Sequence, residues 1–151
     1  MADTKAVKAD SRFTKKDFRG VFWRSFTLLG SMNYERMEAM GFLYAIMPLL
    51  RKIYKDKPEK LKEAMHRHMA AFNMTVAPSP FVMGISTAME ESANDDEDFD
   101  PSTINAIKVS LMGPLSGIGD TFFWGIFRIL ACALAIGFAQ EGNVLAPFIL
   151  L

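Results

Sequence analysis

The longest hydrophobic stretch of the chain lies near its C-terminal end. Residues 121–140 carry one charged side chain, Arg128, and these 20 residues match the length that a helix needs to cross a bilayer. Their apolar side chains favour insertion by roughly 4 to 5 kcal/mol, whereas a central arginine costs about 3 kcal/mol. The pattern therefore predicts a transmembrane helix whose arginine is directed toward protein or water.

The N-terminal part shows hydrophobic positions at helical spacing. Thr14 and Asp17 form a capping-box pattern, and the apolar residues after them recur every three or four positions until Gly30. These apolar residues are Phe18, Val21, Phe22, Phe26 and Leu29. Because the opposite side is basic, the helix suits a membrane surface, but a partner protein or plain solvent would suit it as well.

A second helix is predicted from Tyr34 to about Ile53, with Asn33 as its cap. Residues 40–50 carry no charge, but 11 residues are too few to span a bilayer, and Pro48 should bend or end the helix. The pattern favours an interfacial or re-entrant segment. Further helices are expected from about Pro58 to Phe72, from Phe81 to Glu91, and after Asp100.

Composition and periodicity divide the chain into four segments. Residues 1–13 predict a flexible N-terminal tail, and residues 14–92 hold amphipathic and interfacial helices. Residues 93–100 form an acidic linker, and residues 101–151 form a membrane core segment with a helix break at 113–120. Because the chain stops within an apolar run, we expect that it is truncated at the C-terminus.

The composition narrows the class of protein. Half of the residues are hydrophobic, and 17 basic side chains balance 17 acidic ones. A balanced charge argues against nucleic acid as a partner, since phosphate binding needs a clustered basic excess. The 13 Phe and 11 Met suit lipid or subunit contacts, and also a Met-rich soluble core. We predict an all-α membrane protein with interfacial amphipathic helices and broken or re-entrant helices around a transmembrane helix.

No metal, cofactor or catalytic site is predicted. Cys132 is the single cysteine, which excludes an intrachain disulfide and a cysteine-based metal site. His66 and His68 point about 200° apart on a helix, so they cannot share a metal, and we interpret them as ordinary helix-surface residues. The carboxylates of residues 94–100 raise the question of calcium, but they lack the glycine and glutamate of an EF-hand loop, which favours a spacer.

The stretch LMGPLSGIGDTFFWG, residues 111–125, resembles phosphate-binding loops only superficially. A P-loop needs a lysine after its last glycine, whereas Asp120 follows Gly119 here. A dinucleotide fingerprint needs a third glycine where this sequence has Phe122. The favoured interpretation is a helix break next to a membrane span, because transporters bind substrates at such breaks.

We therefore predict a substrate-binding or translocation loop in this stretch. Glycines allow close approach of a backbone, and hydroxyl and carboxylate groups suit sugar recognition. The loop residues are Gly113, Ser116, Gly117, Gly119 and Asp120. Secondary candidates are Asn33, Tyr34 and Glu35, which open an apolar segment, and Arg128. Helix capping and packing are the alternative for all of them, and for Asn33 the favoured one.

Several blocks together resemble the IID membrane component of the mannose-type (mannose/fructose/sorbose family) sugar phosphotransferase system. The blocks are FTKKDFRGVFWRSF, NYERMEAMGF, LKEAMHRHMAAFN, INAIKVSLMGPLSGIGDTFFWG and EGNVLAPF, and they cover about residues 12–151. Family chains are longer, which agrees with truncation. One departure is MTVAP after Asn73, where relatives commonly have a shorter turn, and this leaves the role of that turn open.

The resemblance implies a subunit of the bacterial cytoplasmic (inner) membrane that is not an enzyme by itself. It implies pairing with a IIC membrane subunit, assembly as a trimer of IIC–IID pairs, and transport of hexoses such as mannose or glucose. IIA and IIB proteins would carry the phosphoryl group, so His66 and His68 are not given that role. It also implies contact with the lipid bilayer and, in some bacteria, docking of a bacteriocin.

Two further expectations concern orientation and alternatives. Seven Lys and Arg among residues 5–24 place the N-terminus in the cytoplasm. A membrane scaffold that organises a partner without transporting is the alternative function. A soluble helical adaptor is opposed by residues 121–140.

Overall fold

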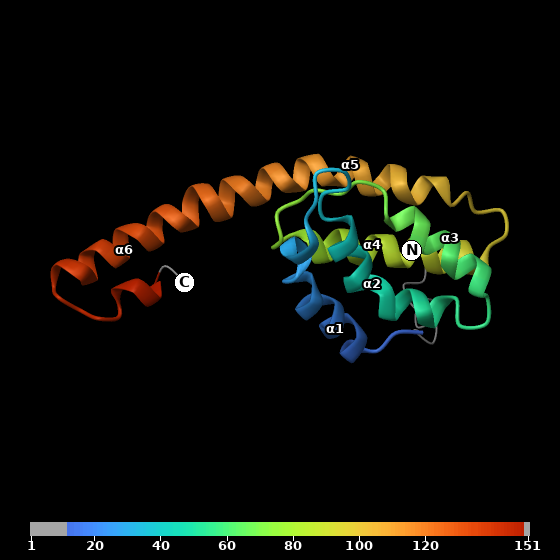
Figure 1. The fold of residues 1–151 in the computed structure, drawn as a ribbon, viewed down its shortest axis with the longest axis horizontal. Coiled ribbons are helices and arrows are strands. Elements are labelled where there is room, and N and C mark those ends of the chain that lie inside the picture. The colour runs from blue at the N-terminus through green and yellow to red at the C-terminus, as the bar shows by residue number, and fades with distance from the viewer. Residues whose placement is uncertain (1–11, 150–151) are drawn as a thin grey trace, which may run out of the picture.

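The computed structural model describes residues 12–149 as a helical domain and a long projecting arm (Figure 1). Within these residues every regular element is helical, which confirms the all-α prediction. The α-helices are α1 (Lys15–Ser25), α2 (Ala39–Ile53), α3 (Pro58–His68), α4 (Ser79–Asp95), α5 (Ser102–Gly119) and α6 (Arg128–Gln140). Short 3₁₀ turns form η1 (Leu28–Ser31) and η3 (Ala146–Ile149), and a π-helix forms η2 (Asp120–Phe127).

The α2 helix is the centre of the domain and contacts α1, η1, α3 and α4. Phe42, Ile46 and Leu50 are fully buried, and burying such a side chain stabilises the fold by about 1.5–3 kcal/mol. The uncharged run 40–50 thus forms a continuous helix buried against protein, and Pro48 stays inside it without ending it. An interfacial or re-entrant position of this segment stays a prediction.

The turn before α2 explains why this helix begins at Ala39 and not at Tyr34. The Asn33 side-chain oxygen accepts hydrogen bonds from the backbone amides of Glu35 at 3.1 Å and Arg36 at 2.8 Å. Met37 then has a φ of 53°, a left-handed conformation that does not continue into an α-helix. Asn33 thus stabilises a turn and does not cap α2.

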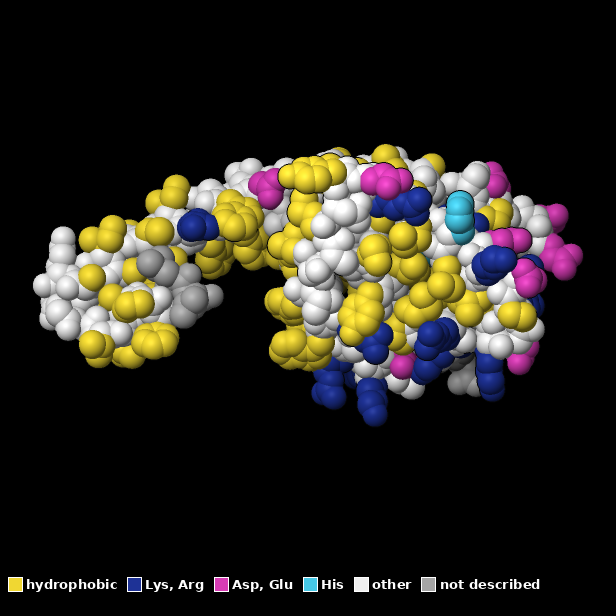
Figure 2. All heavy atoms as spheres, viewed as in Figure 1, with side chains coloured by type: hydrophobic (Ala, Val, Ile, Leu, Met, Phe, Trp, Pro, Cys, Tyr) yellow, Lys and Arg dark blue, Asp and Glu magenta, His cyan; other side chains and the backbone are white. Residues whose placement is uncertain are grey.

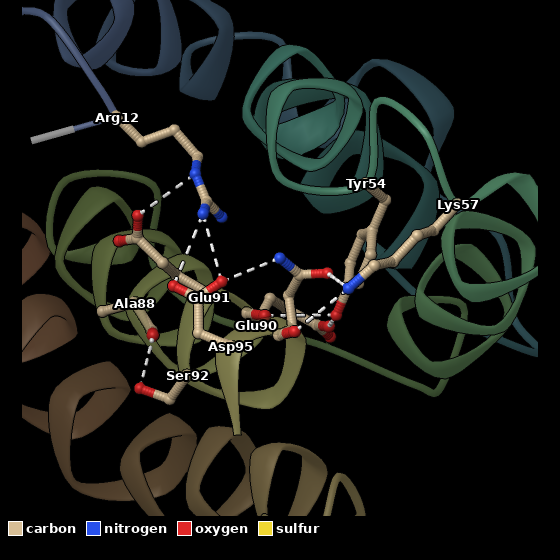
Figure 3. A network of polar contacts seen from close by, with 9 residues as sticks. Arg12, Tyr54, Lys57, Ala88, Glu90, Glu91, Ser92 and Asp95 are labelled. Atoms are coloured by element: carbon tan, nitrogen blue, oxygen red, sulfur yellow. Dashed lines mark hydrogen bonds and ion pairs between the residues drawn. The ribbon is translucent and has the colours of Figure 1, made fainter. Parts of the chain in front are cut away.

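The N-terminal end of the helical domain is held by polar contacts. The predicted capping box is present, since the Thr14 amide donates to Asp17 Oδ2 at 2.8 Å. The predicted tail, residues 1–13, falls mostly outside the described residues. Its last two residues contact the domain: Phe13 is buried, and the exposed Arg12 pairs with Asp95 of α4 at 3.1 Å (Figure 3).

The elements α5, η2 and α6 form one helix of 39 residues, Ser102–Gln140, long and apolar enough to cross a membrane. This confirms the membrane-length helix predicted at 121–140. The predicted break at 113–120 is wrong, because the helix continues through all of these residues. Gly113, Gly117 and Gly119 keep a helical backbone, and Pro114 is tolerated as prolines often are in long apolar helices.

The irregularity lies slightly later, in the π-helix η2. Such wider turns are rare and occur often at functional sites. The α5 part of the long helix packs on the domain, whereas η2 and α6 project beyond it (Figure 1). Hydrophobic side chains cover much of the arm (Figure 2), and Phe122, Ile129 and Leu134 are among those exposed. The arm therefore presents an apolar surface suited to lipid or a membrane partner.

Candidate functional site

A groove of about 730 Å³ lies where residues 73–77 meet the junction of α5 and η2. Its lining contains both polar and aromatic side chains. The polar side chains that line it are Glu38, Asn73, Thr75, Ser116, Asp120 and Arg128. The aromatic ones are Phe123, Trp124 and Phe127. The groove is the place where the helical domain meets the long helix, and three sequence-predicted residues, Ser116, Asp120 and Arg128, line it.

Asp120 is held at the groove by a residue that sequence analysis did not select. The hydroxyl of Thr75 donates to Asp120 Oδ1 at 2.5 Å, and it also lies 3.4 Å from the carbonyl oxygen of Ser116. Within residues 12–149, no side chain donates a hydrogen bond to the other oxygen, Oδ2. The carboxylate is thus oriented through one oxygen, and its second oxygen keeps its capacity to accept hydrogen bonds.

Only one of the three predicted glycines makes a close contact. A Cβ on Gly119 would lie 2.8 Å from the Cβ of Thr75, so glycine lets the loop rest against the helix. A Cβ on Gly113 or Gly117 would meet nothing within 4 Å. The structure therefore brings Ser116, Gly119 and Asp120 together at the groove and leaves the other two glycines elsewhere on the helix.

Arg128, a secondary candidate, joins the same groove. Its guanidinium carbon lies 4.9 Å from the centre of the Trp124 ring, a cation–π distance. Arg128 and Asp120 lie on one helix, about two turns apart. A carboxylate, a guanidinium and an aromatic face therefore line a single groove.

The other secondary candidates lie outside the groove. The Asn33 side chain accepts hydrogen bonds within the turn before α2, and Tyr34 is 99% exposed. Glu35 contacts Arg36, with 3.7 Å between Oε1 and Nε, and lines a separate hollow with Asn105. The structure does not bring these three residues to the groove.

Glu38 is a groove residue that the sequence analysis missed. It is only 2% exposed, and its Oε2 accepts a hydrogen bond from the Met74 amide at 2.9 Å. Burial raises the pKa of this carboxyl, although the Met74 amide opposes the shift. Its only sequence signal is its place in the polar stretch before α2. Glu38 fixes the start of residues 73–77 and so helps to shape the groove.

A second cluster of charges is buried inside the domain around Glu90 of α4. Glu90 accepts from Tyr54 at 2.7 Å and from Arg67 at 2.9 and 3.1 Å (Figure 3 shows the Tyr54 contact). His68 Nε2 lies 2.9 Å from Glu90 Oε1. Burial raises the pKa of Glu90, but hydrogen bonds from His68 and Arg67 outweigh it and lower this pKa to about 2.

This cluster corrects the interpretation of one histidine. His66 is exposed as expected, whereas His68 is buried, and burial lowers its pKa. Arg67 and His68 of α3 and Tyr54, which directly follows α2, all contact Glu90 of α4, so helical spacing alone does not reveal the cluster. The cluster joins α2, α3 and α4 and has a structural role.

A helical domain packed on a membrane-length helix, with a polar groove at the junction, is the architecture of an all-α protein that can cross a membrane. The chain belongs to the mannose/fructose/sorbose family of IID components of the sugar phosphotransferase system, whose family model matches residues 12–151. The proteins of this family are membrane subunits of sugar transport systems.

Curated relatives support the assignment. The chain is 40% identical to the mannose-specific EIID component of Escherichia coli K12 over 149 residues, which is 99% of this chain and 53% of the relative. It is 37% identical to the fructose permease IID component of Bacillus subtilis 168, over 95% of this chain and 52% of the relative. The chain thus spans about half the length of the curated relatives that it matches.

A solved structure agrees with these relatives. The chain is similar to one in the cryo-EM structure of the mannose transporter ManYZ in complex with microcin E492, with a TM-score of 0.83 and 41% identity. The match covers 91% of this chain and 50% of that one. At this identity the likeness covers both fold and family.

Proposed function

We propose that this protein, as part of a longer chain, is the IID subunit of a complex that moves mannose- or glucose-type hexoses across the bacterial inner membrane. A IIC subunit is its membrane partner, and IIA and IIB proteins supply the phosphoryl group. The observation that carries the proposal is the 40% identity to a mannose-specific EIID component along 99% of the chain.

The groove is the proposed contribution of this subunit to the sugar path or to the IIC contact. Asp120 accepts hydrogen bonds from sugar hydroxyls through its free oxygen, while Thr75 fixes the carboxylate. The ring of Trp124 offers an apolar face to the C–H groups of a sugar, and Arg128 beside it donates to sugar oxygens. Ser116 supplies a small polar wall.

The remaining parts of the proposal concern assembly and orientation. The exposed apolar arm suits packing against IIC and lipid, in a trimer of IIC–IID pairs. The basic N-terminal region favours a cytoplasmic N-terminus. The ManYZ transporter is seen with microcin E492, which supports a similar bacteriocin contact for this protein.

The subunit is proposed to perform no phosphoryl transfer itself. Phosphoryl-carrying histidines need access to a protein donor, whereas His68 is 1% exposed and contacts Glu90. His66 is exposed but lies on α3, away from the groove lining. These positions favour a transport role over a catalytic one.

The proposal is tested in membranes from cells that lack their own mannose-type IID subunit. The full-length protein is expressed with its IIC partner, and phosphoenolpyruvate-dependent phosphorylation of mannose is measured after addition of IIA and IIB. We expect activity only when both membrane subunits are present. A IIC subunit that transports at the full rate without this protein would favour the scaffold alternative.

A further inference from the structure

The segment formed by α1 and η1 displays an unusual cluster of exposed aromatic side chains. Phe22, Trp23 and Phe26 are 45%, 66% and 59% exposed, and Leu29 of η1, which also lines one edge of the groove, is 54% exposed. The three rings contact one another, with centroids 5.3 to 5.8 Å apart. We call these four residues the aromatic end. A contiguous cluster of exposed apolar side chains marks an interaction surface, whereas single exposed apolar residues are ordinary on a protein surface.

The opposite end of α1 is cationic. Lys15, Lys16 and Arg19 are exposed, and within residues 12–149 none of them pairs with an acidic side chain. The acidic residue of this helix, Asp17, instead forms an ion pair with Lys52, with 2.7 Å between Oδ2 and Nζ. We call Lys15, Lys16 and Arg19 the basic end. Unpaired positive charge thus gathers at the N-terminal end of the helix, where Phe18 is also exposed, and most of the exposed aromatic surface lies at its C-terminal end, where Arg24 lies over the Tyr44 ring.

The orientation of α1 relative to the membrane-length helix indicates which kind of surface α1 binds. In Figure 1, α1 rises from the lower edge of the domain, across from the long helix, toward the side from which η2 and α6 project. Its aromatic end therefore lies on the side of the membrane-length arm, and its basic end lies farther away. In Figure 2, basic side chains gather along the edge of the domain opposite the long helix.

This order matches the layers of a bilayer surface. Tryptophan and phenylalanine favour the boundary between headgroups and acyl chains, and lysine and arginine favour the phosphate layer outside it. Val21 and Ser25 face the domain and are buried, so the domain fixes how deep the helix can sit. A protein partner would need acids opposite the basic end and an apolar pocket opposite the aromatic end, whereas an anionic leaflet supplies both layers at once.

We propose that α1 and η1 form a binding surface for anionic phospholipid, with the aromatic end inserted at the acyl boundary and the basic end on headgroup phosphates. The inference depends on the membrane location of the family and not on the sugar-binding role of the groove. Each basic side chain near an anionic surface strengthens binding about fivefold. The segment thus anchors the domain obliquely and selects anionic lipid over zwitterionic lipid.

The test uses the full-length protein with its IIC partner in bilayers of phosphatidylcholine, alone or mixed equally with phosphatidylglycerol. A nitroxide is attached at Gly30→Cys, with other cysteines replaced, because a Cβ at Gly30 meets nothing within 4 Å. Its accessibility to oxygen, which enters lipid, is compared with its accessibility to a water-soluble nickel chelate. We expect oxygen to dominate in the anionic bilayer and nickel accessibility to rise several-fold in phosphatidylcholine alone.

Two charge variants separate the basic end from total charge. The first replaces the basic end, Lys15, Lys16 and Arg19, with glutamine, and the matched control replaces Lys55, Lys60 and Lys62, which are also exposed. We expect the first to abolish the effect of phosphatidylglycerol and the control to retain it. Equal accessibility in both bilayers, or a nitroxide reached by neither reagent because protein covers it, would overturn the proposal. These outcomes leave the hexose assay unaffected.

Discussion

The hydroxyl of Thr75 donates to the carboxylate of Asp120 at 2.5 Å, joining residues 45 positions apart in the sequence. The bond links the loop at 73–77 to the first residue of the π-helix. A hydrogen bond to a charged group contributes roughly 1.5–3 kcal/mol, which makes this contact a substantial part of the junction. The geometry of the groove depends on it.

The first prediction concerns this bond. Thr75→Val removes the hydroxyl and keeps the shape, so the free energy of unfolding should fall by about 1–2 kcal/mol. Thermal unfolding of the full-length complex in detergent measures the change. In the Thr75→Val background, Asp120→Asn should cost less than it does alone. Strictly additive losses would show that the two side chains are not coupled.

The second prediction concerns the glycines of α5. Gly119→Ala places a Cβ 2.8 Å from the Cβ of Thr75, and the loop must move away. We expect a loss of about 1–3 kcal/mol in the free energy of unfolding. Gly113→Ala and Gly117→Ala are matched controls with open space around the new methyl group, and each should be neutral or stabilising by up to about 1 kcal/mol. Equal effects at all three positions would contradict the packing described.

The third prediction concerns the buried cluster. Glu90→Gln leaves Arg67 without its charged partner, and the free energy of unfolding should fall by about 3 kcal/mol. Glu91→Gln is the control, because Glu91 is partly exposed and lies 3.8 Å from Arg12. Its loss should stay below about 1 kcal/mol. Chemical unfolding of both variants measures the difference, and similar losses would remove the special role of Glu90.

The fourth prediction concerns pH. Glu90 has a pKa of about 2 in the folded protein and an ordinary value of 4.5, so its stabilisation is complete above pH 4.5 and is lost as the pH falls toward 2. His68 has a pKa below its ordinary 6.5, so the unfolded state takes up its proton first, and stability falls as the pH drops below 6.5. Stability should therefore decline on acidification. The decline should start at lower pH in His68→Gln, and an unchanged pH profile for that variant would contradict the assignment.

The sequence was sufficient for features that depend on local order. The capping box of Thr14 and Asp17, the start of α3 at Pro58 and the membrane-length helix follow from spacing and hydrophobicity, and all are present. Hydrophobicity alone did not distinguish a core helix from an interfacial one at α2, because an uncharged run of residues fits both. The glycines and the proline at 113–120 led to the wrong prediction of a helix break, because a long apolar helix tolerates these residues.

The contacts that build the groove and the buried cluster link distant parts of the chain. Thr75 and Asp120 belong to different elements, and so do Glu38 and Met74. Neither pair has a spacing that marks it in a single sequence. Ser116, Gly119 and Asp120, which lie on the long helix and not in the predicted loop, were selected from their local composition, whereas their contacts with Thr75 required the fold.

The central claim, that the groove contributes to hexose transport, is tested most directly by Asp120→Asn in the mannose phosphorylation assay. Gly117→Ala is the control on the same helix, and size-exclusion chromatography confirms that each complex is intact. Because a hydrogen bond to a charged group is lost, we expect kcat/KM for mannose to fall about tenfold or more in Asp120→Asn and to stay near wild type in Gly117→Ala. Wild-type kinetics for Asp120→Asn in an intact complex would contradict the account.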